Sequence, residues 1–335
     1  MKRPEVLLVM SGETYRTQFG PVERARLGEL ATLGEPVQVE SLDEPAARER
    51  LPAVEVLLTS WGAHALTPEV LAAAPRLRAV IHCAGTVRSI MTEAAWAREL
   101  LVTNAVDANA VPVAEFTFAA VIMAGKRAPF LAARARAARA GWSSGEFGEL
   151  SNRDRTIGIV GFSRIGRRVV ERLAGLETRE VLVFDPFADR DEVKAAGARL
   201  TGLDELLAAS SITSLHAPAL PSTRHMIGAR ELALMPDGAT LINTARGMIV
   251  DTAALEAECE TGRLHAILDV TEPEPLNADS VLYDLPNVMI TPHIAGSLGS
   301  ETRRMTAAAL DELERYASGE DPIAPVTRES MGTSA

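Results

Sequence analysis

Short apolar runs alternate with runs rich in Ala, Leu, Arg and Glu along most of the chain. Continuous apolar runs of strand length, separated by helices, are typical of parallel sheets covered on both faces. Two series of such runs predict an α/β fold with two doubly wound parallel-sheet domains. The first series is Val6–Met10, Val37–Val39, Val54–Thr59, Arg78–His82 and Leu101–Thr103, and the second is Thr156–Val160, Val181–Phe184, Ile212–Leu215, Thr240–Asn243, Ala266–Leu268 and Val288–Thr291.

Helical patterns connect these strands. Pro21–Leu33 and Thr67–Ala73 are helical in the first series, and one long Ala-rich helix is expected over Asn109–Ala140, between the two series. Its Arg134, Arg136 and Arg139 favour a solvated face, with a subunit contact as the alternative. A further helix is expected over Glu301–Tyr316, and we expect the last ten residues, which lack a period, to be poorly ordered.

Composition narrows the class of protein. The 335 residues correspond to two domains of roughly 150 residues. Lys and Arg number 34 against 45 Asp and Glu, and a net charge of −11 argues against a nucleic-acid binder, which needs a basic face. Cys83 and Cys259 match no metal-ligand spacing, so we expect them in the core and expect no metal.

No apolar run has the length that a leader or a membrane span requires. Val6–Met10 is too short for a signal-peptide core. Ala110–Gly125 contains Glu115 and falls short of the roughly 18 residues needed to span a bilayer. The sequence therefore predicts a soluble, cytoplasmic protein with neither a membrane nor a nucleic acid as partner.

The most specific local pattern is a strand, a glycine turn and a helix. The strand Thr156–Val160 leads into Gly161, a helix follows around Gly166, and the next strand ends in Asp185. In this context the pattern predicts dinucleotide binding. The pyrophosphate is expected at the helix N-terminus, and the Asp185 carboxylate is expected to bind the adenosine ribose. Ser163 stands at the second glycine position, where its Cβ either pushes the cofactor outward or lets the hydroxyl bind a phosphate.

Further segments follow in a recognisable order. They are NAVPVAE at 109–115, LHAPALPSTRHMIG at 215–228, MPDGATLINTARGMIVD at 235–251, LDVTEPEPL at 268–276 and TPHIAG at 291–296. With the cofactor loop, they make the chain resemble the D-isomer-specific 2-hydroxyacid dehydrogenases from about Asn104 to Met305. Residues 1–100 match that family in architecture more than in motif.

The resemblance implies a domain organisation. A Rossmann-type NAD-binding domain, residues 107–297, is expected to be inserted into a flavodoxin-like substrate-binding domain formed by 1–106 and 298–335. The family's active site lies in the cleft between two such domains.

Three residues are expected to carry the chemistry. The fork of Arg246 suits binding of a carboxylate and a keto oxygen. His293 follows a strand end and titrates in the range that a general acid/base needs. By resemblance, Glu274 bonds the other ring nitrogen, which orients the imidazole and favours its charged form.

The resemblance also implies binding residues. Asp269 is expected to hold the nicotinamide carboxamide, and the loop after the fourth strand to bind the substrate carboxylate through backbone N–H groups. The expected NAD-binding residues are Gly161, Ser163, Arg164, Ile165, Gly166, Asp185, Ala217, Pro218, Thr223, Thr244, Ala245, Asp269, His293 and Gly296. The expected substrate-binding residues are Ala84, Gly85, Thr86 and Arg246.

The sequence leaves several alternatives open. Thr86-Val-Arg88 departs from the family pattern, and Arg88 is either a cation for a second acidic group or a surface residue. Glu272 is expected to be exposed. His216 and His225 are expected to be structural or at the cofactor edge, whereas His82 and His64 are candidates to line the substrate pocket. Trp142 either closes a neighbouring subunit's pocket or packs in an interface of a homodimer formed through the 109–142 arm.

Together these features predict an NAD-dependent enzyme that interconverts a small 2-keto acid and its D-2-hydroxy acid. The alternative from another class is an NAD(H)-sensing scaffold or corepressor of the same fold, which the acidic charge and the absence of a basic tail disfavour. An alanine dehydrogenase lacks support because the order Arg246, Glu274, His293 fits the first family. Asp185 predicts NAD rather than NADP, because it would repel a 2′-phosphate.

Overall fold

The computed structural model describes residues 2–139 and 149–332. Within this part, the chain divides into two compact units, which are treated separately. Unit 1 comprises 1–109 and 297–335, and unit 2 comprises 110–296. The sequence placed the corresponding boundaries after residues 106 and 297.

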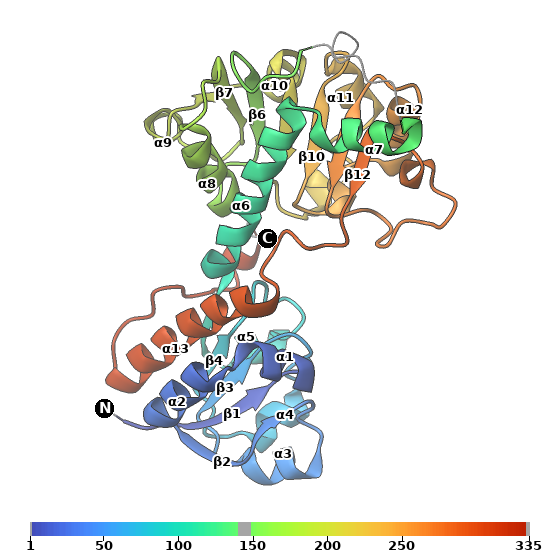
Figure 1. Ribbon diagram of the computed structural model, residues 1–335. Helices are drawn as coiled ribbons and strands as arrows, with labels where there is room; N and C mark the ends of the chain where they lie inside the picture. Colours follow the sequence, from blue (N-terminus) through green and yellow to red (C-terminus); the bar gives the residue numbers. More distant parts are fainter. Residues whose placement is uncertain (1, 140–148, 333–335) are drawn as a thin grey trace. The chain divides into compact units, whose positions relative to one another are not determined.

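Unit 1 is a five-stranded parallel sheet in the order β2-β1-β3-β4-β5 (Figure 1). Helices α1, α2 and α13 cover one face, where Phe19, Leu27 and Leu310 are buried, and α3, α4 and α5 cover the other. The strands are β1 (Glu5–Val9), β2 (Thr32–Val39), β3 (Val56–Thr59), β4 (Ala79–His82) and β5 (Leu101–Asn104), and the helices are α1 (Gly12–Gln18), α2 (Pro21–Leu30), α3 (Pro45–Arg50), α4 (Pro68–Ala73), α5 (Glu93–Trp96) and α13 (Thr302–Ser318).

Unit 2 is a seven-stranded parallel sheet in the order β12-β11-β10-β9-β6-β7-β8. The chain fills one side of β6 and then the other, which is the doubly wound dinucleotide-binding order. The strands are β6 (Thr156–Val160), β7 (Glu180–Phe184), β8 (Arg199–Leu200), β9 (Ile212–Leu215), β10 (Thr240–Asn243), β11 (His265–Leu268) and β12 (Val288–Ile290). Two doubly wound α/β sheets confirm the predicted fold class.

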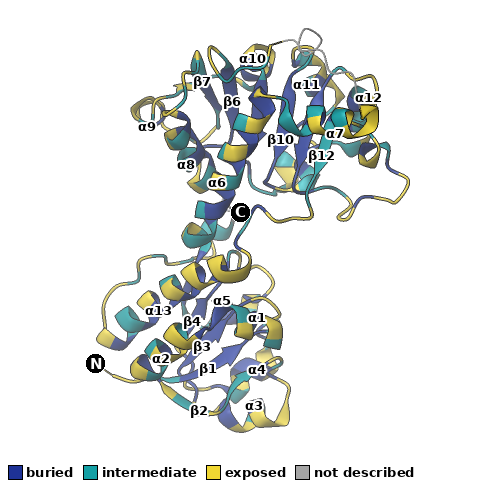
Figure 2. Cartoon of the chain, viewed as in Figure 1, coloured by how far each residue is buried: buried dark blue, intermediate teal, exposed yellow. Residues whose placement is uncertain are grey.

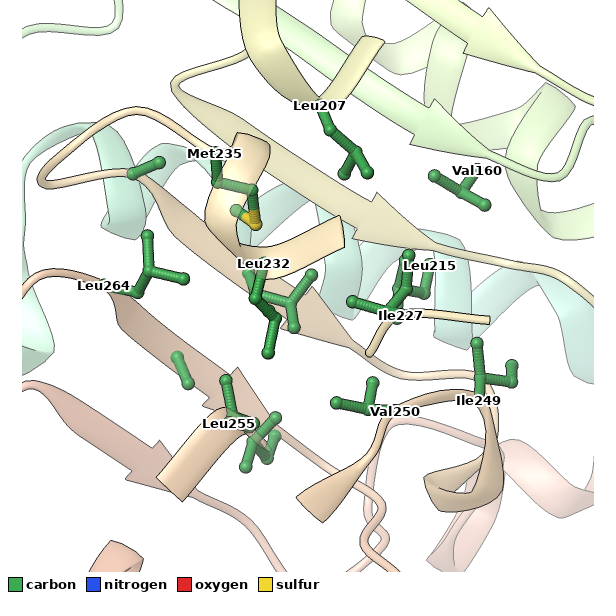
Figure 3. Close-up of a cluster of buried hydrophobic side chains, with 14 of the residues drawn as sticks. Val160, Leu207, Leu215, Ile227, Leu232, Met235, Ile249, Val250, Leu255 and Leu264 are labelled. Atoms are coloured by element: carbon green, nitrogen blue, oxygen red, sulfur yellow. The ribbon is translucent and has the colours of Figure 1, made fainter. Parts of the chain in front are cut away.

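Both faces of this second sheet are buried (Figure 2). Figure 3 shows the face packed against α10, α11 and α12, where Leu207, Leu232 and Leu255 meet the strands. The opposite face packs against α6, α7, α8 and α9. These helices are α6 (Val106–Gly125), α7 (Ala128–Ala138), α8 (Arg164–Leu173), α9 (Arg190–Ala195), α10 (Leu203–Ala209), α11 (Ala229–Leu234) and α12 (Thr252–Glu260).

The single helix expected over 109–140 is wrong, because α6 and α7 are separate helices. Arg127 between them adopts φ +48°, and Pro129 stands in the first turn of α7. Proline cannot donate the i→i−4 hydrogen bond and disfavours helical backbone in the residue before it. Phe130 of α7 then packs on the His265 ring at 4.6 Å between centroids.

Helix α6 is, among the described residues, the one helix long and apolar enough to cross a membrane by length and composition alone. Half of its most apolar stretch is buried inside the protein. The helix is longer than the apolar run Ala110–Gly125, because residues 106–109 form its first turn.

The segment after α13 packs beside β5 as far as Val326, where the last ten residues begin. The Val326 N–H donates to Val102 O at 2.8 Å, and Pro325 forms a bridge with Thr103. The Glu312 carboxylate accepts the N–H groups of Ile323 and Ala324. These contacts fix the segment beside β5.

Candidate active site and NAD-binding loop

The turn between β6 and α8 is built around two glycines that tolerate no side chain. Gly161 has φ +98°, and a Cβ there would lie 2.7 to 2.8 Å from the backbone of His216 and Ala217. A Cβ on Gly166 would lie 2.0 Å from Gly161 O. The carboxyl ends of β6 and β9 therefore meet closely at the point where the strand order reverses, which is where such sheets bind ligands.

Ser163, in contrast, has room for its side chain. It is exposed and precedes the first residue of α8, with φ −90°. Its hydroxyl has no hydrogen-bond partner among the described residues, and it does not cap the helix. Arg164 beside it is also exposed, whereas Ile165 packs against the buried face.

Asp185 is held at the mouth of this loop. One carboxylate oxygen accepts the Phe162 N–H at 2.8 Å, and the other accepts the Phe187 N–H at 2.9 Å. The residue comes directly after β7 and is half-buried. Its place next to the glycine turn is the one that a ribose-binding carboxylate requires.

Two further cofactor candidates stabilise their own loops. The Thr223 hydroxyl donates to Pro218 O and accepts the Leu220 N–H at 3.0 Å. Thr244 is buried after β10, with its hydroxyl 2.8 Å from that of Thr117 on α6. Their role toward NAD stays a prediction.

His293 and Glu274 form a pair in unit 2. His293 Nδ1 lies 2.6 Å from Glu274 Oε1, and the two side chains are 50% and 43% exposed. With Nδ1 engaged in this bond, Nε2 is the ring nitrogen that remains for proton exchange. A cavity of about 590 Å³ adjoins the pair and is lined also by Tyr283 and Pro292.

The turn that carries His293 is fixed by Asp269. His293 has φ +54°, a left-handed conformation uncommon for a residue other than glycine. Asp269 is buried, with 2% of its surface exposed. Its carboxylate accepts hydrogen bonds from the Thr291 hydroxyl at 2.6 Å and from the Ile294 and Ala295 N–H groups at 2.8 and 2.9 Å. This network was not foreseen from the sequence, which assigned Asp269 to the nicotinamide.

Arg246 follows β10 and is exposed at the same edge of the sheet. Asn243 fixes the turn, since its side chain accepts the Ala245 N–H and donates to Arg246 O. Partial desolvation lowers the pKa of the Arg246 guanidinium, while the charge of Glu274 acts in the opposite direction. An arginine starts so far above neutrality that it stays cationic.

Comparison with known proteins places this site in a family. The protein-family model described as "D-isomer specific 2-hydroxyacid dehydrogenase, NAD binding domain" matches residues 118–295. A glyoxylate reductase from Aeropyrum pernix is 36% identical over 78% of this chain and 79% of its own length. The chain belongs to the D-isomer specific 2-hydroxyacid dehydrogenase family. The family and NAD as cofactor, both predicted from the sequence, are thereby confirmed.

Two other relatives show that similar proteins are named for different substrates. A D-3-phosphoglycerate dehydrogenase from Mycobacterium bovis is 33% identical over 87% of this chain, which spans about 55% of that relative's length. The solved structure of a D-lactate dehydrogenase from Aquifex aeolicus with NAD and lactic acid has 28% identity and a TM-score of 0.72, covering 94% of this chain and 96% of the other. These members carry different substrate names, so the family does not fix the substrate here.

The residues that competed for catalytic roles have other partners. Glu272 is partly buried, not exposed as expected, and bonds Arg224 at 2.7 Å, with His225 at 3.4 Å. His216 is buried against Ser214, and burial lowers its pKa to about 3. Among the described residues, neither Glu272 nor His216 is hydrogen-bonded to His293.

In unit 1, the structure excludes one pocket candidate. His82 is buried in the sheet, bonded to Thr59 at 2.9 Å, and burial lowers its pKa to about 4. It therefore cannot line a substrate pocket, whereas His64 is exposed on the loop after β3.

The predicted substrate loop follows β4. Ala84 is buried, Gly85 is half-buried and Thr86 is exposed. The guanidinium of Arg88 donates to Met331 O of the chain's terminal segment. Arg88 is therefore tied to the protein's own backbone.

Both cysteines are buried and free, as expected of core residues. Burial raises the pKa of each thiol, that of Cys259 to about 12. Among the described residues, no group of three or more His, Cys, Asp or Glu side chains is arranged to hold a metal ion. Trp142 lies outside the described residues.

Proposed function

We propose that the protein interconverts a 2-keto acid and the corresponding D-2-hydroxy acid with NAD(H), and that His293 is the general acid/base. The His293–Glu274 pair carries this proposal. It places a titratable ring, oriented by a carboxylate, in the same unit as the NAD loop and beside an open cavity. Family membership supports the reaction class.

In the reductive direction the residues have separate roles. Bound NADH supplies a hydride to the keto carbon. The Arg246 guanidinium binds the substrate carboxylate and polarises the carbonyl. His293 gives the Nε2 proton to the carbonyl oxygen, and Glu274 stabilises the charged ring before that transfer. In the oxidative direction His293 takes the hydroxyl proton back.

The test is His293→Gln, with exposed His225→Gln as a control in the same unit. Removing the general acid should lower kcat for keto-acid reduction by about 100-fold or more. NADH binding, followed by fluorescence, should stay intact because the glycine loop is untouched. A variant that retains half of the wild-type kcat would contradict the role of His293. NADH binding with no turnover of any 2-keto acid by the wild type would instead favour a sensing protein.

We further propose a homodimer formed through the 109–142 arm. Met123 of α6 is exposed, and Val111 and Ile122 are only half-buried. A two-fold contact would cover these apolar side chains. Light scattering should give twice the 35.8 kDa chain mass, and a monomer at working concentration would contradict the proposal.

A further inference from the structure

The sheet of unit 1 has its own switch point. The chain runs from β1 outward to β2 and then returns to β3 on the other side of β1. In open parallel sheets, ligands bind at the carboxyl ends of the strands where the order reverses. In unit 1 that point lies between the loop after β1, residues 10–11, and the loop after β3, residues 60–67.

These two loops are held together by backbone contacts. Ser60 N–H donates to Val9 O at 3.1 Å, and Ser11 N–H donates to Trp61 O at 3.0 Å. Gly62 has φ +91°, and a Cβ there would lie 2.8 Å from Ser11 N. The backbone on both sides of Trp61 is thus fixed.

The Trp61 side chain is the unusual feature of this edge. Its residue is 44% exposed although its backbone is anchored, and its indole makes no hydrogen bond within the described residues. An anchored aromatic side chain loses little conformational entropy when a ligand covers it. Trp61 therefore offers a preformed apolar surface at the expected ligand position.

The two loops offer no Lys or Arg to bind a second anionic group. The loops 10–11 and 60–67 contain no Lys or Arg. A Glu40 oxygen accepts the Gly12 N–H at 2.8 Å, and Arg16 Nη1 would lie 3.4 Å from a Cβ on Gly12, so the start of α1 carries one group of each charge. Arg88, on the neighbouring loop after β4, is committed to Met331 O. A phosphate or second carboxylate would therefore find no Lys or Arg on either loop.

We propose that Trp61 is a specificity-determining residue that contacts the substrate side chain, and that the substrates are 2-keto acids with a branched aliphatic or aromatic side chain. This proposal rests on the proposed function. The proposed substrates differ from those in the names of two relatives. Phosphoglycerate carries a charged side chain, and glyoxylate has no side chain.

The experiment compares kcat/KM for 4-methyl-2-oxopentanoate, phenylpyruvate, glyoxylate and phosphohydroxypyruvate in the wild type and in Trp61→Ala. We expect the wild type to prefer the two apolar acids by about tenfold or more. Trp61→Ala should reduce that preference about tenfold, mainly through KM, because a contact made equally in ground and transition states is lost. Trp61→Phe should restore most of it. Val22→Ala, which removes an exposed apolar side chain from α2, is the matched control.

A binding measurement makes the test independent of turnover. Saturable quenching of indole fluorescence by 4-methyl-2-oxopentanoate should be seen in the wild type and be lost in Trp61→Phe. Equal quenching in both proteins would overturn the proposal for Trp61. So would a wild-type preference for glyoxylate or phosphohydroxypyruvate, or equal losses for all four acids in Trp61→Ala. Absence of turnover with every 2-keto acid would count against the proposed function instead, and the quenching result would still decide the role of Trp61.

Discussion

The NAD loop of unit 2 and the predicted substrate loop of unit 1 use glycine in opposite ways. In unit 2, a Cβ on Gly161, Gly166 or Gly247 would come within 2.0 to 2.8 Å of backbone atoms. In the predicted substrate loop of unit 1, a Cβ on Gly85 would have nothing within 4 Å. The NAD loop is thus specified by backbone packing that only glycine allows, whereas the substrate loop is open to substitution.

This difference explains why one unit carries motifs and the other does not. Binding a constant cofactor requires the same close approach of strand, turn and helix, so the required residues are readable from sequence. Binding a variable substrate depends on side chains such as the one proposed for Trp61, and these side chains change with the substrate.

The largest expected effect contrasts the two glycines directly. Gly166→Ala forces its methyl group into Gly161 O and should lower the free energy of unfolding by about 1–3 kcal/mol, with loss of most NADH binding. Gly85→Ala should change the free energy of unfolding by no more than about 0.5 kcal/mol. Thermal unfolding and NADH titration measure both. Equal destabilisation by the two variants would break the comparison.

Much of the fold followed from the sequence because buried parallel strands are continuous apolar runs. Strands β6, β9 and β10 have the predicted bounds. The break between α6 and α7 was missed because Ala on both sides of Lys126–Arg127 favours helix, and Pro129 also fits a first turn. The edge strand β8, two residues long, has no pattern to detect.

The site was predictable to the extent that it depends on motifs. His293 and Glu274 were paired by resemblance and lie 2.6 Å apart. The network around Asp269 was not, because its donors, Thr291 and the N–H groups of Ile294 and Ala295, reach it only after the chain turns at His293. Trp61 escaped notice because a single tryptophan after a strand has no motif, and its exposure is a property of the fold.

Glu274→Gln tests the chemistry of unit 2 without disturbing its packing. Glutamine can still accept the Nδ1 hydrogen bond, but it removes the negative charge that favours imidazolium. The alkaline limb of the kcat/KM profile for keto-acid reduction should move to lower pH. The buried His82 and His216, whose pKa values are lowered to about 4 and about 3, stay neutral above pH 5 and do not contribute to this limb. An unchanged profile would count against the pair.

Asp185→Ser tests cofactor preference at the ribose end of the NAD loop. The wild type should prefer NADH over NADPH by at least about tenfold in kcat/KM, equivalent to roughly 1.4 kcal/mol. The variant should lose that preference, because the carboxylate that repels a 2′-phosphate is gone. Asp191→Ser, which removes an exposed charge six residues later, should keep it. The main competing cation is Arg190, and a wild type that used NADPH equally well would show that Asp185 does not face the ribose.

Ser163 gives the smallest expected effect and tests how far the NAD loop depends on glycine. Its exposed hydroxyl has no partner in the described part of the chain, and its φ of −90° does not require glycine. A hydroxyl that bonds a phosphate oxygen contributes about 1 kcal/mol net. Ser163→Gly and Ser163→Ala should therefore each weaken NADH binding by about fivefold, a free-energy loss of about 1 kcal/mol. If the Cβ instead pushes the cofactor outward, Ser163→Gly should tighten binding and Ser163→Ala should leave it unchanged. Two dissociation constants thus separate a phosphate-binding hydroxyl from steric displacement.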